Sequence, residues 1–229
     1  MSASRAILVV AKAPVPGLVK TRLMARYSAV EAATLASAAL LDTLDTALSV
    51  PGALVVVSMA GVIDDAVGSD DLRARLSRTT VMEQHGDTLG DRLDRAHRDA
   101  AAQVGGGRVM QIGMDTPQVT VELLVSGLDA LDDHDAALGL ATDGGWWGLA
   151  VSDARGAHVL PDVAMSRSDT GERTLDALRH GGCSVALLKS LTDVDHPADV
   201  TEVAETCAPT SAFARISAEL RSAVAHERS

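Results

Sequence analysis

The sequence predicts an α/β domain in which a mostly parallel sheet carries helices on both faces. Short apolar runs alternate with amphipathic segments from the first residues onward. The apolar runs are continuous, which is typical of strands that are buried on both faces of a sheet. Because the chain has 229 residues, it can form one large domain or two small ones.

Seven segments have the composition of strands. The clearest are A-I-L-V-V and A-L-V-V-V near the N-terminus, while the third segment is weaker. In chain order they cover residues 6–10, 53–57, 79–82, 108–113, 136–141, 147–151 and 184–188.

Amphipathic helices are predicted between these strands, over about residues 30–49 and 88–104. A third helix is expected to begin at Thr120, whose hydroxyl can cap it, with Glu122 favourably placed in its first turn. His196-Pro197 opens a further helix. We predict one domain over residues 1–205 and a C-terminal helix or tail over residues 206–229.

The composition limits the classes of function. Acidic residues outnumber basic ones 31 to 20, and the formal net charge of −11 disfavours nucleic acids and anionic membranes as partners. No apolar run approaches the roughly 20 residues of a spanning helix. The two cysteines, Cys183 and Cys207, have no metal-ligand spacing. We therefore expect a soluble cytoplasmic protein.

A basic turn follows the first predicted strand, at residues 11–23, A-K-A-P-V-P-G-L-V-K-T-R-L. In open α/β sheets, ligands bind beyond the carboxyl ends of the strands. Lys12, Lys20 and Arg22 suit phosphate oxygens. The alternative is a solvated basic loop. The glycine patterns of a Walker loop and of a dinucleotide-binding fingerprint are both absent.

Two aspartates are candidate ligands for Mg²⁺ or Mn²⁺, because hard cations prefer oxygen. Asp115 follows the fourth strand, and Asp195 lies in D-V-D-H-P, residues 193–197. An aspartate before a turn is also good turn chemistry, and Asp195 or His196 can equally cap the helix that follows.

Two further segments are candidate ligand contacts. In T-D-G-G-W-W, residues 142–147, the glycines after Asp143 allow close approach of the backbone to a ligand. We expect Trp147 in the core and Trp146 in a pocket wall. Residues 84–92 open a helix, whose start suits a base or ribose better than a phosphate because Asp87 and Asp91 are acidic.

Taken in order, five segments resemble motifs of the GT-A superfamily of nucleotide-diphospho-sugar transferases, and in particular a bacterial group of GT-A-like glycosyltransferases. The resemblance spans about residues 6–204. Met114, Gln118-Val119 and the segment at residues 165–171 depart from the group's pattern, which puts the acceptor in doubt. The matching segments are residues 14–23, 84–92, 113–117, 143–146 and 193–197.

The resemblance implies a Rossmann-like GT-A fold and a nucleotide bound across the ends of the first strands. It implies a divalent ion, Mg²⁺ or Mn²⁺, at Asp115 with Asp195 as second ligand. Asp143 is the candidate general base or acceptor-orienting residue, with Gly144, Gly145 and Trp146 on the acceptor side. The candidate nucleotide and phosphate contacts are Ala11, Lys12, Gly17, Lys20, Arg22, Gln84 and Gly90.

The function predicted first is metal-dependent transfer of a sugar from a nucleotide-diphospho-sugar to a small acceptor. A nucleotidyltransferase that joins a nucleoside triphosphate to a phosphorylated small molecule is the alternative, and the lysines of the first loop favour it. A nucleotide-binding module without catalysis is the third possibility. The sequence does not predict the oligomeric state.

Overall fold

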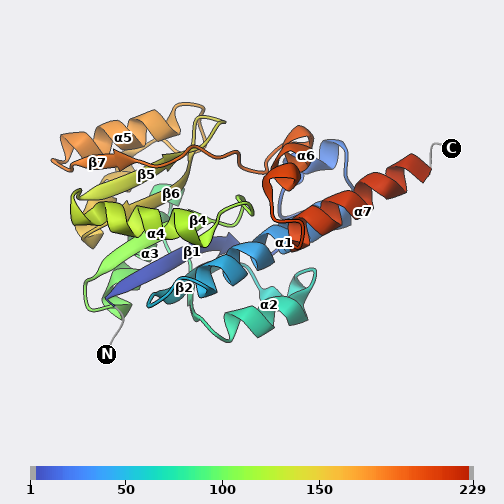
Figure 1. The fold of residues 1–229 in the computed structure, drawn as a ribbon, viewed down its shortest axis with the longest axis horizontal. Coiled ribbons are helices and arrows are strands. Elements are labelled where there is room, and N and C mark those ends of the chain that lie inside the picture. The colour runs from blue at the N-terminus through green and yellow to red at the C-terminus, as the bar shows by residue number, and fades with distance from the viewer. Residues whose placement is uncertain (1–3, 227–229) are drawn as a thin grey trace.

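A seven-stranded mixed sheet lies between two layers of helices in the computed structural model, which describes residues 4–226 (Figure 1). The strand order is β3-β2-β1-β4-β6-β5-β7. All neighbouring pairs are parallel except those made by β6, which is antiparallel to both β4 and β5. The strands are β1 (Arg5–Lys12), β2 (Leu54–Ala60), β3 (Thr80–Glu83), β4 (Arg108–Gly113), β5 (Ala136–Leu140), β6 (Trp146–Val151) and β7 (Val185–Leu187).

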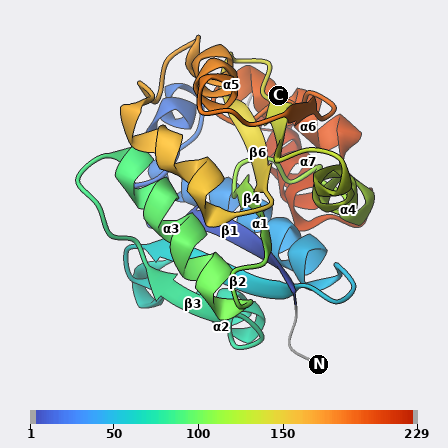
Figure 2. The same ribbon diagram turned by 90° about the vertical axis from the view of Figure 1, so that its left-hand side faces the viewer.

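The predicted three-layer α/β/α fold with a mostly parallel sheet is confirmed. Alternate residues of β1 face opposite layers, Ile7 and Val9 toward one and Ala6 and Leu8 toward the other. The first layer contains α1 (Ala29–Leu48), α2 (Ser69–Leu76) and α4 (Val121–Asp129). The second contains α3 (Leu89–Gln103), the 3₁₀ segment η4 (Ala154–Asp162) and α5 (Thr170–His180), as Figure 2 shows from the side of α3.

Side-chain caps define where the predicted helices begin. Ser28 caps α1 and Thr88 caps α3, each in a reciprocal capping box. The expected cap at Thr120 is confirmed, because its hydroxyl accepts a hydrogen bond from the Leu123 N–H at 3.3 Å. Two helices were not predicted, α2 and α5, because each buries only one or two large apolar side chains.

The C-terminal residues form α6 (Pro197–Thr206) and α7 (Ala212–His226). Phe213 of α7 is buried with Leu35 of α1 and Val200 of α6 in one hydrophobic cluster. The carboxylate of Asp42 accepts hydrogen bonds from the N–H groups of Ala212 and Phe213, both at 2.8 Å. The boundary predicted at residue 205 therefore falls in the last turn of α6, and the residues before and after it share one core. Residues 1–3 and 227–229 of the predicted segments lie outside the described residues.

The parallel strands β1, β2 and β4 end at the same edge of the sheet. Their carboxyl ends bring the loops that follow them together, so residues far apart in sequence can share one site. Across residues 4–226, no helix combines the length and the apolar character that crossing a membrane requires.

Candidate functional site

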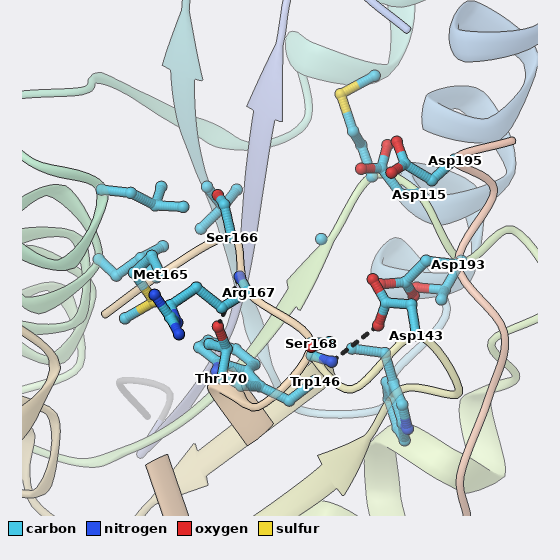
Figure 3. A pocket seen from close by; sticks show the side chains of 18 of the residues that line it. Asp115, Asp143, Trp146, Met165, Ser166, Arg167, Ser168, Thr170, Asp193 and Asp195 are labelled. Atoms are coloured by element: carbon cyan, nitrogen blue, oxygen red, sulfur yellow. Dashed lines mark hydrogen bonds between the residues drawn. The ribbon is translucent and has the colours of Figure 1, made fainter. Parts of the chain in front are cut away.

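A cavity of about 680 Å³ opens at this edge of the sheet. Six segments line most of it: the first loop at residues 20–22, the start of α3, the end of β4, the β5–β6 turn, residues 165–170 and residues 193–196. Figure 3 shows that acidic and non-acidic side chains lie at different ends of this cavity. Four aspartates, Asp115, Asp143, Asp193 and Asp195, lie at one end, whereas Met165, Arg167 and Trp146 lie at the other.

Lys20 holds the acidic end together. Its ammonium nitrogen lies 2.8 Å from Asp115 Oδ2 and 3.8 Å from Asp195 Oδ1, and its side chain is only 9% exposed. Lys20 adopts a left-handed backbone conformation with φ of 48°, which is uncommon outside glycine. Arg22 forms an ion pair with Asp195. The loop after β1, the end of β4 and the segment before α6 thus converge at one place.

The structure decides between the two interpretations of Asp195. The carboxylate of Asp199 accepts hydrogen bonds from the N–H groups of Asp195 at 3.0 Å and His196 at 2.6 Å, so Asp199 satisfies the start of α6. The Asp195 carboxylate faces Lys20 and Arg22 instead. His196 is the N-cap residue of α6, so the interpretation of His196 as the helix cap is confirmed and that of Asp195 is wrong. A backbone hydrogen bond of 2.9 Å from Val194 N–H to the carbonyl of Asp115 fixes the two segments together.

Asp193 belongs to the site and was not predicted. Burial raises the pKa of its carboxyl group to about 7, and the nearby carboxylates of Asp115 and Asp143 add to the rise, while Lys20 opposes it. Its Oδ1 atom is buried without a hydrogen-bond partner. The available signal was the spacing in D-V-D, because residues 193 and 195 of an extended segment point to the same side while the buried Val194 points away.

The Asp143 turn is packed tightly against residues 166–171. Asp143 Oδ1 accepts a hydrogen bond of 2.8 Å from the Gly145 N–H. The Gly144 carbonyl accepts one of 2.8 Å from the Gly171 N–H. Gly144 has a φ of +90°, and a Cβ atom there would overlap the carbonyl oxygen of Ser168. Gly144 therefore allows the two segments to meet, and it does not line the cavity.

Gly144→Ala is expected to lower the free energy of unfolding by at least about 3 kcal/mol. The substitution places a side chain on a residue with a left-handed backbone, and its Cβ atom would overlap the Ser168 carbonyl oxygen. Gly182→Ala is the matched control, since Gly182 has a φ of +88° and a Cβ atom added there would meet nothing within 4 Å. We expect this control to lose only about 1 kcal/mol. Equal losses in urea denaturation would contradict the close packing of the two segments.

The two adjacent tryptophans differ in burial, as expected. Trp147 is 2% exposed, and its indole N–H donates a hydrogen bond of 2.9 Å to the carbonyl of Lys189. Trp146 is half-buried and lies beside Thr170 and Arg167 at the non-acidic end of the cavity (Figure 3). Gly145 lines the cavity between Asp143 and Trp146.

Five predicted nucleotide contacts lie outside the cavity lining: Ala11, Lys12, Gly17, Gln84 and Gly90. The Lys12 ammonium donates to the carbonyl of Leu18 at 2.6 Å. The Gln84 amide donates to the carbonyls of Ala11 and Ser58, both at 2.9 Å, and so joins three strand ends. Gly17 makes a turn with φ of +78°, and Gly90 lets α3 approach the backbone of η4. Each of these residues has a structural role, and their contact with a nucleotide stays a prediction.

The acidic end does not form a complete set of metal ligands. Within residues 4–226, no three side chains from histidine, cysteine, aspartate and glutamate are grouped to hold an ion. Asp115 and Asp195 nevertheless face one common point, which the Lys20 ammonium occupies. Any divalent ion there would need further ligands from a substrate or from water.

Gln111 and His97 form the polar layer beneath the cavity. Gln111 of β4 lines the cavity, and its Oε1 atom is buried without a hydrogen-bond partner. His97 of α3 is fully buried, and its ring interacts with the Gln111 side chain without a hydrogen bond of regular geometry. Burial lowers the pKa of His97 from 6.5 to about 4, although Gln111 and Asp94 act in the opposite direction.

This pKa predicts the acid sensitivity of the fold. Between pH 6.5 and 4 the unfolded chain binds a proton at His97 while the folded protein does not, so stability falls as the pH falls. The full effect is about 3 kcal/mol. His97→Leu should reduce the slope of unfolding free energy against pH in this range, measured by urea denaturation. An unchanged slope would contradict a neutral buried His97, whatever the constant offset between the two proteins.

A family model described as an uncharacterized protein conserved in bacteria (DUF2064) matches residues 43–167, which is more than half of the chain. The chain belongs to the DUF2064 family. The match includes α3, β4 and the Asp143 turn, and thus much of the cavity. Among curated proteins, none matches the chain.

Solved structures share the fold of this DUF2064 protein. A protein from Desulfovibrio desulfuricans G20, provisionally named a nucleotide-diphospho-sugar transferase, is 27% identical with a TM-score of 0.83, over 97% of this chain and 96% of that one. A 4-diphosphocytidyl-2C-methyl-D-erythritol synthase from Anaerococcus prevotii DSM 20548 is 12% identical with a TM-score of 0.57, over 87% and 95%. A CMP:2-keto-3-deoxy-manno-octonic acid synthetase complexed with CTP is 13% identical with a TM-score of 0.55, over 87% and 96%.

Proposed function

We propose that this DUF2064 protein is a glycosyltransferase that moves a sugar from a nucleotide-diphospho-sugar to a small acceptor. The observation that supports it best is the convergence of Lys20, Arg22, Asp115 and Asp195 in one cavity of about 680 Å³. The similarity to the Desulfovibrio protein supports the same class of transferase. The left-handed conformation of Lys20 adds support, because such backbone strain is concentrated at functional sites.

The number of cations favours a diphosphate over a triphosphate. Lys12 ends β1, and Lys20 and Arg22 follow it. The Lys12 ammonium donates a hydrogen bond to the carbonyl of Leu18, and Lys12 lies outside the cavity lining. Lys20 and Arg22 remain, and four carboxylates line the same end. A triphosphate brings more negative charge into this acidic end than two cations balance, whereas a diphosphate with one divalent ion is closer to neutrality.

The donor set fits Mg²⁺ or Mn²⁺. Negative charge is in excess at the acidic end. Asp193 Oδ1 is buried without a hydrogen-bond partner, and two carboxylates, those of Asp115 and Asp195, share the Lys20 ammonium. Asp115 and Asp195 would hold the ion once the Lys20 ammonium between them moves to the substrate phosphate. Phosphate and water would complete the coordination, as is usual for Mg²⁺. When bound, such an ion stabilises the negative charge that develops on the departing diphosphate.

The chain's own residues have distinct roles in this proposal. Lys20 and Arg22 bind the diphosphate oxygens and stabilise the charge they gain as the bond from the sugar C1 to the diphosphate breaks. The acceptor oxygen forms the new bond to C1. The Gly145 N–H fixes Asp143, whose carboxylate orients the acceptor hydroxyl and takes its proton. Asp193 is buried beside these groups, and burial together with the neighbouring carboxylates raises its pKa to about 7 when no ion is bound.

Nucleotidyl transfer is the second candidate. It is favoured by the fold shared with a synthetase complexed with CTP, and by Arg167, which supplies a third cation to the cavity lining. In that reaction a nucleoside triphosphate would join a phosphorylated small molecule and release pyrophosphate. A nucleotide-binding module without catalysis is the third candidate.

Product analysis separates these candidates. The protein is incubated with Mg²⁺ or Mn²⁺ and either nucleotide-sugars or nucleoside triphosphates with sugar phosphates. We expect metal-dependent release of nucleoside diphosphate from a nucleotide-sugar. Pyrophosphate release from a triphosphate would support nucleotidyl transfer instead. Nucleotide binding without turnover would indicate the module, and no rise in melting temperature with any nucleotide would reject all three.

A further inference from the structure

The end of the cavity away from the aspartates has a different composition. Met165 and Trp146 supply thioether and aromatic surface there, and Leu93 of α3 belongs to the same hydrophobic cluster. Leu89 of α3 also lines the cavity. In Figure 3 the labelled aspartates are all on the opposite side of the cavity. A ligand there would meet an apolar wall that lies away from these four carboxylates.

Arg167 is the basic residue that lines this end. Asp169 Oδ1 accepts a hydrogen bond of 3.1 Å from Arg167 Nε, and Asp169 Oδ2 accepts one of 2.7 Å from Arg173 Nε. Arg173 thus holds Asp169, and Asp169 holds the Nε side of Arg167. The two terminal nitrogens of Arg167 make no hydrogen bond with any described residue, and its side chain is 59% exposed. This leaves free the side of the guanidinium that binds a carboxylate or phosphate with two hydrogen bonds.

The backbone around Arg167 is held in place. The Arg167 N–H donates to the hydroxyl of Thr170 at 3.0 Å, and the same hydroxyl donates to the Ala164 carbonyl at 3.0 Å. Ser166 has a φ of 60°, a left-handed conformation that a free loop rarely adopts. The hydroxyl-bearing Ser166 and Ser168 flank Arg167 and line the cavity. Residues 164–170 are therefore a structured wall that presents one cation and two hydroxyl groups.

Gln111 at the floor supplies an independent observation. It is 3% exposed, lines the cavity, and has a buried amide oxygen without a partner. Buried amide groups are rarely left unsatisfied. His97 interacts with this side chain from below, and the part of Gln111 that lines the cavity is open to a ligand or ordered water.

We infer that this end binds the acceptor through an anionic group, so that the acceptor is a small organic carboxylate or phosphate with an apolar body. Arg167 binds the anionic group, the Ser166 and Ser168 hydroxyls add hydrogen bonds, and Met165 and Trp146 contact the body. Gln111 hydrogen-bonds a polar atom at the inner end of the ligand. The inference rests on the proposed function in calling this ligand the acceptor, but the anion site itself is independent of the reaction.

The test is calorimetric binding of three probes that share a ring, namely phenyl phosphate, benzoate and benzyl alcohol. We expect at least one anion to bind the wild-type protein at least tenfold more tightly than the alcohol. Arg167→Met should weaken that anion about tenfold or more and leave the alcohol unchanged. Arg179→Met removes an exposed charge of the same sign from α5, outside the cavity lining, and should change nothing. The stronger anion shows whether carboxylate or phosphate is the natural group.

A second measurement separates this inference from the proposed function. UDP with Mn²⁺ is expected to bind together with the anion, because the two occupy opposite ends of the cavity. Displacement of the anion by UDP, equal anion binding in the wild type and Arg167→Met, or no anion binding would each overturn the inference. If the anion binds through Arg167 while no nucleotide-sugar is turned over, the proposed function fails and the anion site stands.

Discussion

Asp115→Asn is expected to lower metal-dependent turnover by about two to three orders of magnitude while the protein stays folded. The substitution removes one of the two carboxylates that face Lys20 and would hold the divalent ion. The fold should persist because the Asp115 side chain is 40% exposed and its structural bond is made by the backbone carbonyl, which Asn keeps. Turnover is measured as nucleoside diphosphate release at saturating nucleotide-sugar, and folding by thermal unfolding.

Asp129→Asn is the matched control for this experiment. It changes the net charge by the same amount at an exposed position at the end of α4, outside the cavity lining. The control should keep full activity. An Asp115→Asn protein with near wild-type turnover would remove Asp115 from the ion site and leave the metal assignment without its main ligand.

Lys20→Met is expected to weaken nucleoside diphosphate binding about 10- to 150-fold. Hydrogen bonds to charged groups contribute about 1.5–3 kcal/mol, which corresponds to that range of dissociation constants. Methionine keeps much of the volume of the lysine stem, which is buried, so the measurement isolates the ammonium group. The loss should shrink as salt is added, because screening already weakens the interaction in the wild type. The measurement is a titration with UDP or GDP and Mg²⁺ at two salt concentrations.

Lys12→Met provides the comparison from the same loop. It removes an equal charge, but the Lys12 ammonium is bound to the Leu18 carbonyl and does not line the cavity. We expect its effect on the dissociation constant to be small. Similar losses in both variants would mean that the loop attracts nucleotide only through its overall charge, and that the position of Lys20 is not important.

Local sequence patterns were sufficient to predict most elements of the fold. Continuous apolar runs such as residues 6–10 indicated strands covered on both faces, and β1 has that environment. The cap at Thr120 follows from one side chain and the backbone beside it. The helix α2 was missed because only Leu72 and Leu76 of its eight residues are buried, which is too weak a period to recognise.

The candidate site was predictable only in part. The charge of four side chains and their positions along the chain were enough to predict them as site residues, because each follows a predicted strand or precedes a predicted helix. They are Lys20, Arg22, Asp115 and Asp195. The same reasoning included Lys12 and Gln84, whose polar groups the structure directs to backbone carbonyls. Nothing local distinguishes a lysine that faces a cavity from one that closes a turn.

The composition and the order of its motifs determined that this chain forms a three-layer α/β/α domain with cations and carboxylates at its strand ends. The fold alone decided that Lys20 lies between Asp115 and Asp195, that Asp193 is buried beside them, and that Arg167 faces the opposite end of the cavity. Strand and helix formation depends on neighbours within a few residues. The charge environment of a carboxylate depends instead on which distant segments surround it, and these are fixed only when β4, the Asp143 turn and the segment before α6 pack together.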